Sequence, residues 1–122
     1  MSNDGTDPIR FLPLPTSEFQ ILLVLVDRPR HGHAIKREVG ERTDGDVVMG
    51  PGTLYGAIKR MLGSRLIEET FERPDPADDD QRRRYYRITA LGRRVAELEA
   101  RRMLQLLGIA SEQELIPEWK AP

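Results

Sequence analysis

The sequence contains no cysteine and only two histidines among its 122 residues. Without cysteine the chain can form neither a disulfide framework nor a thiolate metal site. The two histidines, His31 and His33, lack the His-x-x-x-His spacing of a zinc site, and no glycine-rich phosphate loop follows a predicted strand. No arrangement of serine, histidine and aspartate suggests nucleophilic catalysis. We therefore predict a protein that is not an enzyme and that requires no cofactor and no metal ion.

Long hydrophobic runs are absent as well. The longest, residues 21–26, is far too short to span a bilayer. The polar residues 1–8 lack the basic and then apolar layout of a secretory signal. Together with the absence of disulfides, these features predict a cytoplasmic protein with no membrane partner. The length fits one domain, and 39% hydrophobic residues suffice for one modest core.

No charge of one sign dominates, because 19 basic residues are balanced by 20 acidic ones. The sequence pI of about 6.1 argues weakly against a nucleic-acid-binding surface, since such domains are often basic. The charges are nevertheless segregated along the chain. Basic residues gather within segments 28–42, 59–65 and 82–87, and acidic residues within 75–80 and 112–118. A near-neutral total can therefore hide a basic face.

Hydrophobic periodicity predicts helices and strands in a recognisable order. We expect helices over 16–27, 32–42 and 50–63, strands over 66–72 and 83–89, and a long helix over 89–107 that ends at Gly108. Ser17 and Gln20 have the spacing of a capping box. In the second strand we expect Tyr86 to face inward and Tyr85 outward.

This order predicts a mainly α-helical fold with a small β-hairpin, a winged helix–turn–helix domain followed by a C-terminal dimerisation helix. We divide the chain into a flexible N-terminal tail (1–13), a DNA-binding domain (14–89) and a dimerisation helix with its tail (90–122). In such a motif the third helix enters the DNA major groove, and the preceding helix braces it.

The third predicted helix has a core-facing stripe centred on Leu54, Ile58 and Met61. Small or polar residues occupy its other sides: Gly52, Thr53, Tyr55, Gly56, Lys59, Arg60 and Gly63. A glycine on an exposed helix lowers the stability of the helix relative to alanine. The glycines here therefore suggest that the helix backbone approaches a partner closely. Lys59 and Arg60 can bond phosphates or guanine edges. The alternative for these two residues is an ordinary solvated face.

Further basic residues are predicted to contact DNA from both sides of this helix. Lys36 lies on the second helix, and Arg82, Arg83 and Arg84 lie on the hairpin, where they can contact phosphates. The alternative for the hairpin arginines is pairing with the acidic run 78–80 across the same loop. Both interpretations can hold if the acidic run pairs with the arginines in the free protein and DNA then displaces it.

The long C-terminal helix carries more apolar residues than one small core needs. The excess follows position 98 and comprises Leu98, Met103, Leu104, Leu106 and Leu107. A monomer would expose several of these leucines together, and a two-fold homodimer would bury them. A dimer also places two third helices about one DNA turn apart, which matches a palindromic operator.

Several segments together resemble the PadR family of transcriptional regulators. They are HGHAI at 31–35, GPGTLYGAIKRM at 50–61, LIE at 66–68 and RRYYRITALGR at 83–93. The resemblance spans residues 14–107 and implies a dimeric winged-helix repressor that acts on its own or a nearby promoter. It also implies that Thr53, Tyr55 and Lys59 lie on the DNA-reading element and that the helix from Leu91 onward mediates dimerisation.

Three features depart from the family pattern. His33 stands where the family more often has tyrosine, and Arg65 stands where a glycine usually precedes Leu-Ile, a position that can require a left-handed backbone. The C-terminal region is short, as in the compact branch of the family. Some compact members bind flat ligands between aromatic side chains, but the long helix here has no aromatic residue, so no small-molecule effector is assigned. The alternative function is a winged-helix protein–protein interaction module without DNA binding.

Overall fold

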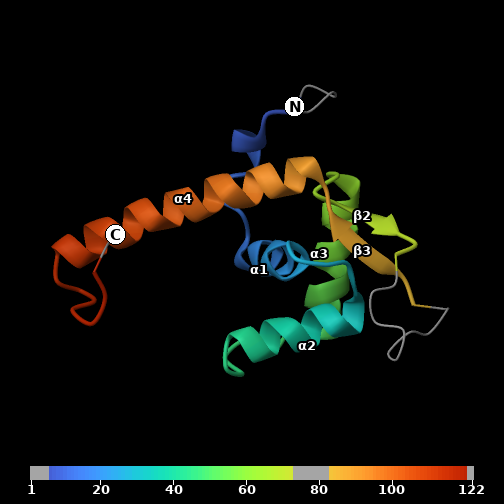
Figure 1. Ribbon diagram of the computed structural model, residues 1–122, viewed down its shortest axis with the longest axis horizontal. Helices are drawn as coiled ribbons and strands as arrows, with labels where there is room; N and C mark the ends of the chain where they lie inside the picture. Colours follow the sequence, from blue (N-terminus) through green and yellow to red (C-terminus); the bar gives the residue numbers. More distant parts are fainter. Residues whose placement is uncertain (1–5, 73–82, 121–122) are drawn as a thin grey trace.

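The computed structural model describes residues 6–72 and 83–120. Its elements are a 3-10 helix at Pro8–Phe11, α1 at Thr16–Leu25, β1 at Arg30–His31, α2 at Gly32–Arg42, α3 at Pro51–Gly63, β2 at Ile67–Thr70, β3 at Tyr85–Ile88 and α4 at Ala90–Glu112 (Figure 1). Three helices, a small antiparallel sheet and a long final helix confirm the predicted mainly α-helical winged-helix fold.

Helix α1 lies at the centre of the domain, because its sequence offers apolar side chains in every direction. It contacts α2, α3, α4 and β3. Ile21 and Leu22 are completely buried in the resulting core. The predicted capping box is wrong: Pro15 occupies the N-cap position, and no side chain caps this end of the helix. The helix also ends two residues earlier than predicted, at Leu25.

The sheet has three strands in the order β1-β3-β2, with both pairs antiparallel. The two-residue strand β1 was not predicted, since it is too short to produce a periodic pattern. Its presence corrects the orientation expected for Tyr85, which is only 1% exposed. Tyr85 is the register partner of His31, and the two rings meet edge to face with centroids 5.2 Å apart. This cross-strand contact covers a side chain that a two-stranded hairpin would leave exposed.

Arg65 ends helix α3 in the left-handed conformation, with φ of 64°. The Leu66 N–H donates to the carbonyl of Met61 and the Arg65 N–H to that of Leu62, which is the hydrogen-bond pattern of a Schellman motif. The prediction of a left-handed backbone at this position is confirmed. Arginine occupies a conformation that glycine adopts without a steric penalty.

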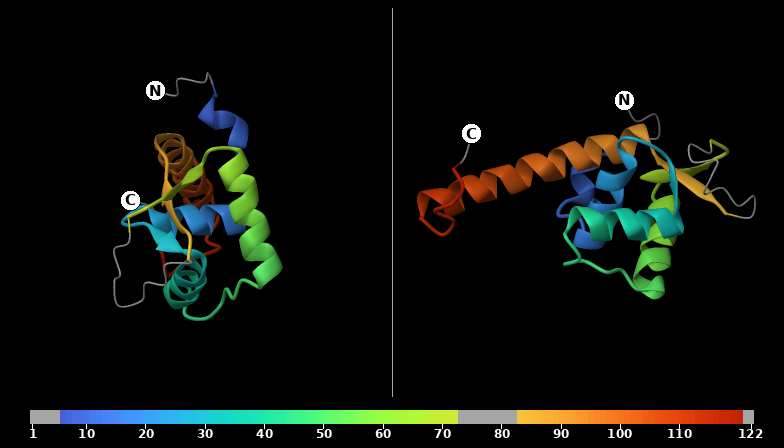
Figure 2. Two further views of the ribbon diagram at one scale, coloured as in Figure 1. Left: turned by 90° about the vertical axis from the view of Figure 1, so that its right-hand side faces the viewer. Right: turned by 60° about the horizontal axis from the view of Figure 1, so that its bottom comes forward.

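Helix α4 begins against the sheet and then leaves the domain. Thr89 caps it by accepting a hydrogen bond from the Gly92 N–H. A side chain at Gly92 would collide with the Leu66 carbonyl, so this glycine permits close packing. The predicted stop at Gly108 is wrong, because the helix continues to Glu112 and the left-handed residue is Glu114. The C-terminal half of α4 projects beyond the other helices (Figures 1 and 2).

Part of the segment predicted as a flexible tail is folded. The 3-10 helix Pro8–Phe11 contacts α4, and Phe11 and Leu12 pack against the core. Apolar side chains at these two positions explain why the chain docks there. Residues 1–5 of that segment lie outside the described part of the chain. Among the residues that the structure describes, no helix has the length and apolar character needed to cross a membrane.

Candidate nucleic-acid interface

Helix α3 presents the predicted face to solvent. Leu54, Ile58 and Met61 are buried, whereas the residues predicted to face DNA are exposed: Gly52, Thr53, Tyr55, Lys59 and Arg60. Gly50 occupies the N-cap position of the helix, and Pro51 occupies its first position. The open N–H groups of this first turn point outward with the positive end of the helix dipole, a combination that favours phosphate.

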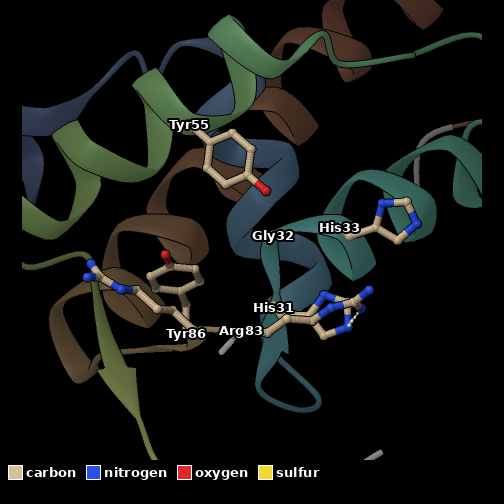
Figure 3. A pocket seen from close by; sticks show the side chains of 7 residues that line it. His31, Gly32, His33, Tyr55, Arg83 and Tyr86 are labelled. Atoms are coloured by element: carbon tan, nitrogen blue, oxygen red, sulfur yellow. Dashed lines mark hydrogen bonds between the residues drawn. The ribbon is translucent and has the colours of Figure 1, made fainter. Parts of the chain in front are cut away.

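Tyr55 links α3 to the start of α2. It is 52% exposed, yet its ring lies directly over the backbone of Gly32. A Cβ atom at Gly32 would come within 2.7 Å of the Tyr55 hydroxyl oxygen and 2.8 Å of its Cε1 atom. Gly32 therefore leaves the space that the tyrosine ring fills, and its lack of a side chain sets where the hydroxyl group points (Figure 3).

His31 joins the start of α2 to the wing, which comprises β2, β3 and their connection. It is 2% exposed and caps α2, since its Nδ1 accepts a hydrogen bond of 3.1 Å from the Ala34 N–H. His31 thus has a structural role at the start of α2. Its other ring nitrogen, Nε2, lies 2.9 Å from Nη1 of Arg83, one of the predicted DNA-binding residues (Figure 3).

These side chains surround a solvent-open cavity of about 390 Å³ between α2, α3 and β3. It is lined by His31, Gly32, His33, Tyr55, Arg83, Arg84 and Tyr86. None of these lining residues carries a carboxylate. The Tyr86 hydroxyl is protonated at neutral pH and can donate a hydrogen bond, and burial raises its pKa further. The cavity is therefore rich in donors and positive charge, which suits an anion.

Arg60 lies on the opposite flank of α3 and has a different environment. Its Nε donates to Oε2 of Glu18 at 3.2 Å. Glu18 belongs to the central helix α1 and is almost buried, whereas the Arg60 side chain is 60% exposed. This ion pair directs Arg60 toward α1, so of the two basic residues predicted on this helix Lys59 lies nearer the centre of the open face.

The remaining predicted DNA contacts fall in several places. Lys36 is half-buried on α2 and lines a shallow groove with His33 and Val48. Arg82 lies outside the described residues, as does the acidic run 78–80 that was its alternative partner. Arg84 stands at the cavity and approaches Glu69 of the neighbouring strand at 3.7 Å.

Sequence comparison places this chain among known proteins. The profile of the "Transcriptional regulator PadR-like family" matches residues 21–98, which is more than half of the chain. The chain belongs to the PadR-like family of transcriptional regulators. The match covers the second half of α1, the helices α2 and α3, the wing and the first part of α4.

Two relatives of the chain are uncharacterised. One is a 37.1 kDa protein in transposon Tn4556 of Streptomyces fradiae, 32% identical over 102 residues, which are 84% of this chain and 27% of that protein. The other is protein X of Lysinibacillus sphaericus, 32% identical over 73 residues, which are 60% of this chain and 64% of that protein. The chain thus spans less than two thirds of either relative.

Solved structures of PadR-like and other regulators share the fold. A transcriptional regulator from Clostridium thermocellum superposes with a TM-score of 0.67 at 23% identity, over 92% of this chain and 96% of that one. A PadR family regulator from Clostridium difficile gives 0.67 at 23%, over 80% and 97%. Bacillus subtilis PadR, solved in complex with operator DNA, gives 0.57 at 15%, over 70% and 45%.

His31 lines the cavity of this PadR-like chain but was not predicted as a functional residue. Arg84, which also lines the cavity, was predicted together with Arg82 and Arg83 to contact phosphates. The segment 82–87 contains four arginines, and the sequence pattern does not distinguish which of them point toward α2. The strand pairing of His31 with Tyr85 brings the arginines and the histidine together, and that pairing depends on the unpredicted strand β1.

The residues predicted to mediate dimerisation divide into two groups. Leu98 and Met103 are half-buried, and Met103 packs against the domain's own core. The other three are exposed by 44–52%: Leu104, Leu106 and Leu107. Ile109, also on the projecting half of α4, is 50% exposed and was not among the predicted residues. These four exposed side chains point to several sides of α4, so no single face of their own domain could cover them.

Proposed function

We propose that this PadR-like chain is a sequence-specific DNA-binding regulator that acts as a homodimer and represses its own or a nearby promoter. In this proposal the protein binds DNA and performs no catalysis. The observation that carries it is the donor-rich cavity beside the open face of α3. Both features lie on the elements that a winged-helix protein presents to DNA, and none of the described residues that line the cavity carries a carboxylate.

Each part of the proposed interface has a distinct role. Thr53, Tyr55 and Lys59 on α3 face the major groove, where side chains can read base edges. Arg83 and Arg84 on the wing contact the phosphate backbone, which contributes affinity and register but no direct sequence information. The fold shared with Bacillus subtilis PadR, which was solved with operator DNA, supports this assignment.

The homodimer in the proposal rests on α4. Four apolar side chains on its projecting half are exposed, and a second copy related by two-fold symmetry would bury those on the side of α4 that it contacts. Two copies would also offer two α3 helices to the two halves of a palindromic operator. Light scattering at micromolar concentration should give twice the chain mass of 14.0 kDa. A mass near 14.0 kDa would contradict the dimer.

The proposed DNA binding is tested by fluorescence anisotropy with the chain's own upstream DNA and a scrambled duplex over a series of salt concentrations. We expect tighter binding to the upstream DNA and an affinity that falls steeply with salt, because phosphate contacts release counterions. The net charge of −1 favours the alternative of a protein–protein interaction module. Equal, weak and salt-independent binding to both duplexes would support that alternative.

A further inference from the structure

The Arg60 side chain on α3 is held at one of its nitrogen atoms and exposed at the other two. Its Nε donates a hydrogen bond of 3.2 Å to Oε2 of Glu18. Among the residues that the structure describes, none accepts a hydrogen bond from Nη1 or Nη2, and the side chain is 60% exposed. These two atoms carry four of the five N–H groups of the guanidinium group, and they can therefore donate to a partner outside the chain.

Glu18 holds the guanidinium group from the interior of the domain. It lies in the first turn of α1, is only 8% exposed, and within the described part of the chain its carboxylate accepts a hydrogen bond from Arg60 alone. An almost buried carboxylate is unfavourable without a partner, so the ion pair restrains both side chains. Because the guanidinium group is planar and rigid, a fixed Nε–H limits the directions in which Nη1 and Nη2 can point.

The guanidinium group lies over the preceding turn of α3. A Cβ atom at Gly56 would be 3.4 Å from Nη1 of Arg60, which is van der Waals contact. Four residues correspond to about 6 Å along a helix, so the side chain carries its charge toward the N-terminal half of α3. In helix–turn–helix proteins the N-terminal residues of this helix contact base edges. The absence of a side chain at Gly56 therefore leaves room for the guanidinium group where a base edge would approach.

We propose that Arg60 recognises a guanine in the major groove through Nη1 and Nη2, and that Glu18 is the positioning residue for this contact. The inference rests on the proposed DNA-binding function and assigns one of its specificity determinants. Guanine presents two acceptors, O6 and N7, to the major groove, and one arginine side chain can donate to both. This contact requires the guanidinium plane to be held in one orientation, whereas a mobile positive charge suffices for a phosphate. The restraint by Glu18 therefore favours guanine over phosphate as the partner.

The guanine contact is tested with modified DNA. Anisotropy titrations of the full chain compare the upstream duplex with duplexes in which each guanine in turn is replaced by 7-deazaguanine, which pairs normally but lacks the N7 acceptor. We expect at least one replacement to weaken binding of the wild type about tenfold. Arg60→Ala should bind the upstream duplex about tenfold more weakly than the wild type and should bind that modified duplex equally well, because the contact is already lost.

Two variants of Glu18 test positioning separately from contact, with circular dichroism as the check on folding. Glu18→Met has similar length but cannot accept a strong hydrogen bond, whereas Glu18→Gln retains an oxygen that can accept from Nε of Arg60. We expect Glu18→Met to lose the discrimination against 7-deazaguanine and Glu18→Gln to retain it. Both variants remove the same negative charge, so a general electrostatic effect would change both alike. Tighter binding by Glu18→Met would show that Glu18 withholds Arg60 from DNA and would overturn the inference.

Arg94→Ala is the matched control for the loss of an arginine, because Arg94 forms an exposed ion pair with Glu97 on α4. It should keep the affinity and the discrimination of the wild type. Two results would overturn only this inference: a wild type that prefers the upstream duplex but tolerates every 7-deazaguanine, or an Arg60→Ala variant that still discriminates. Equal binding of the wild type to the upstream and scrambled duplexes would overturn the proposed function, and the guanine contact with it.

Discussion

Arg65 occupies a backbone conformation in which a side chain is unfavourable, since its φ of 64° brings Cβ close to the backbone. Replacement with glycine removes that conflict and keeps the hydrogen bonds that end α3. We expect Arg65→Gly to raise the free energy of unfolding by about 1 kcal/mol, measured from the urea midpoint at unchanged slope. Arg65→Ala removes the same side chain but retains Cβ, so it should give no such gain. Equal stabilisation by both variants would show that the arginine side chain, and not the backbone, is the cause.

Gly32 controls the position of Tyr55, because a methyl group there would occupy the space of the phenol ring. Gly32→Ala should displace the ring and weaken binding of the upstream duplex about as much as Tyr55→Ala, with little change in unfolding temperature. The displaced ring is half-exposed, so its movement costs little core packing. Gly40→Ala is the control in the same helix, since its new methyl group would meet only the Val47 carbonyl at 3.7 Å. Normal DNA binding by Gly32→Ala would contradict the role assigned to Tyr55.

Glu99 connects α4 to the segment that leads into α1. Its side chain is fully buried and accepts two hydrogen bonds from Arg102, at 2.7 and 2.9 Å. These bonds from Arg102, with a smaller contribution from a backbone hydrogen bond at Leu14, lower the pKa of Glu99 below its ordinary value of 4.5. The half of α4 that packs against the domain is thus attached to it through an ionised carboxylate.

A carboxylate whose pKa is lowered by folding stabilises the protein at pH values above its unfolded pKa, and that contribution is lost as the pH falls through the folded value. Glu99→Gln should therefore reduce the free energy of unfolding by about 1 kcal/mol at pH 7, and the difference from wild type should shrink below pH 4.5. Urea unfolding over a pH series measures this. Glu97→Gln, at an exposed pair with Arg94, should change little at any pH. A difference that persists undiminished at low pH would exclude ionisation as the cause.

The helices could be predicted from the sequence because their apolar periods and end signals are local. The start of α3 at Gly50-Pro51 and its buried stripe are confirmed. The pairing of β1 with β3 joins residues more than fifty positions apart. A two-residue strand has no periodic pattern from which this pairing could be predicted. The cavity depends on this pairing. Tyr55 and Arg83 were therefore each predicted as functional residues, but the cavity that they line together with His31 was not predicted. The continuation of α4 past Gly108 reflects apolar residues that favour helix on both sides of that glycine.

The whole molecule has an asymmetric shape, with a packed domain at one end and half of α4 projecting from it (Figure 2). An exposed helix with leucine or isoleucine on several sides is unfavourable in water, because each buried side chain of this size is worth about 2 kcal/mol. Burial against a second copy would recover this free energy. The domain's own stability should then be largely independent of the exposed side chains, since they contact little of it.

Replacing exposed leucines on the projecting half of α4 with charged residues should therefore prevent dimerisation without unfolding the domain. We expect the double variant Leu104→Glu and Leu107→Glu to have the mass of one chain by light scattering, with helical content near that of the wild type by circular dichroism. Its affinity for a palindromic duplex should fall by at least about a hundredfold, because a copy bound to one half-site no longer keeps a second copy close to the other half-site. Glu97→Lys changes charge on the half of α4 that packs against the domain and should leave the mass at twice 14.0 kDa. A double variant that keeps the dimer mass would place the interface elsewhere on the molecule.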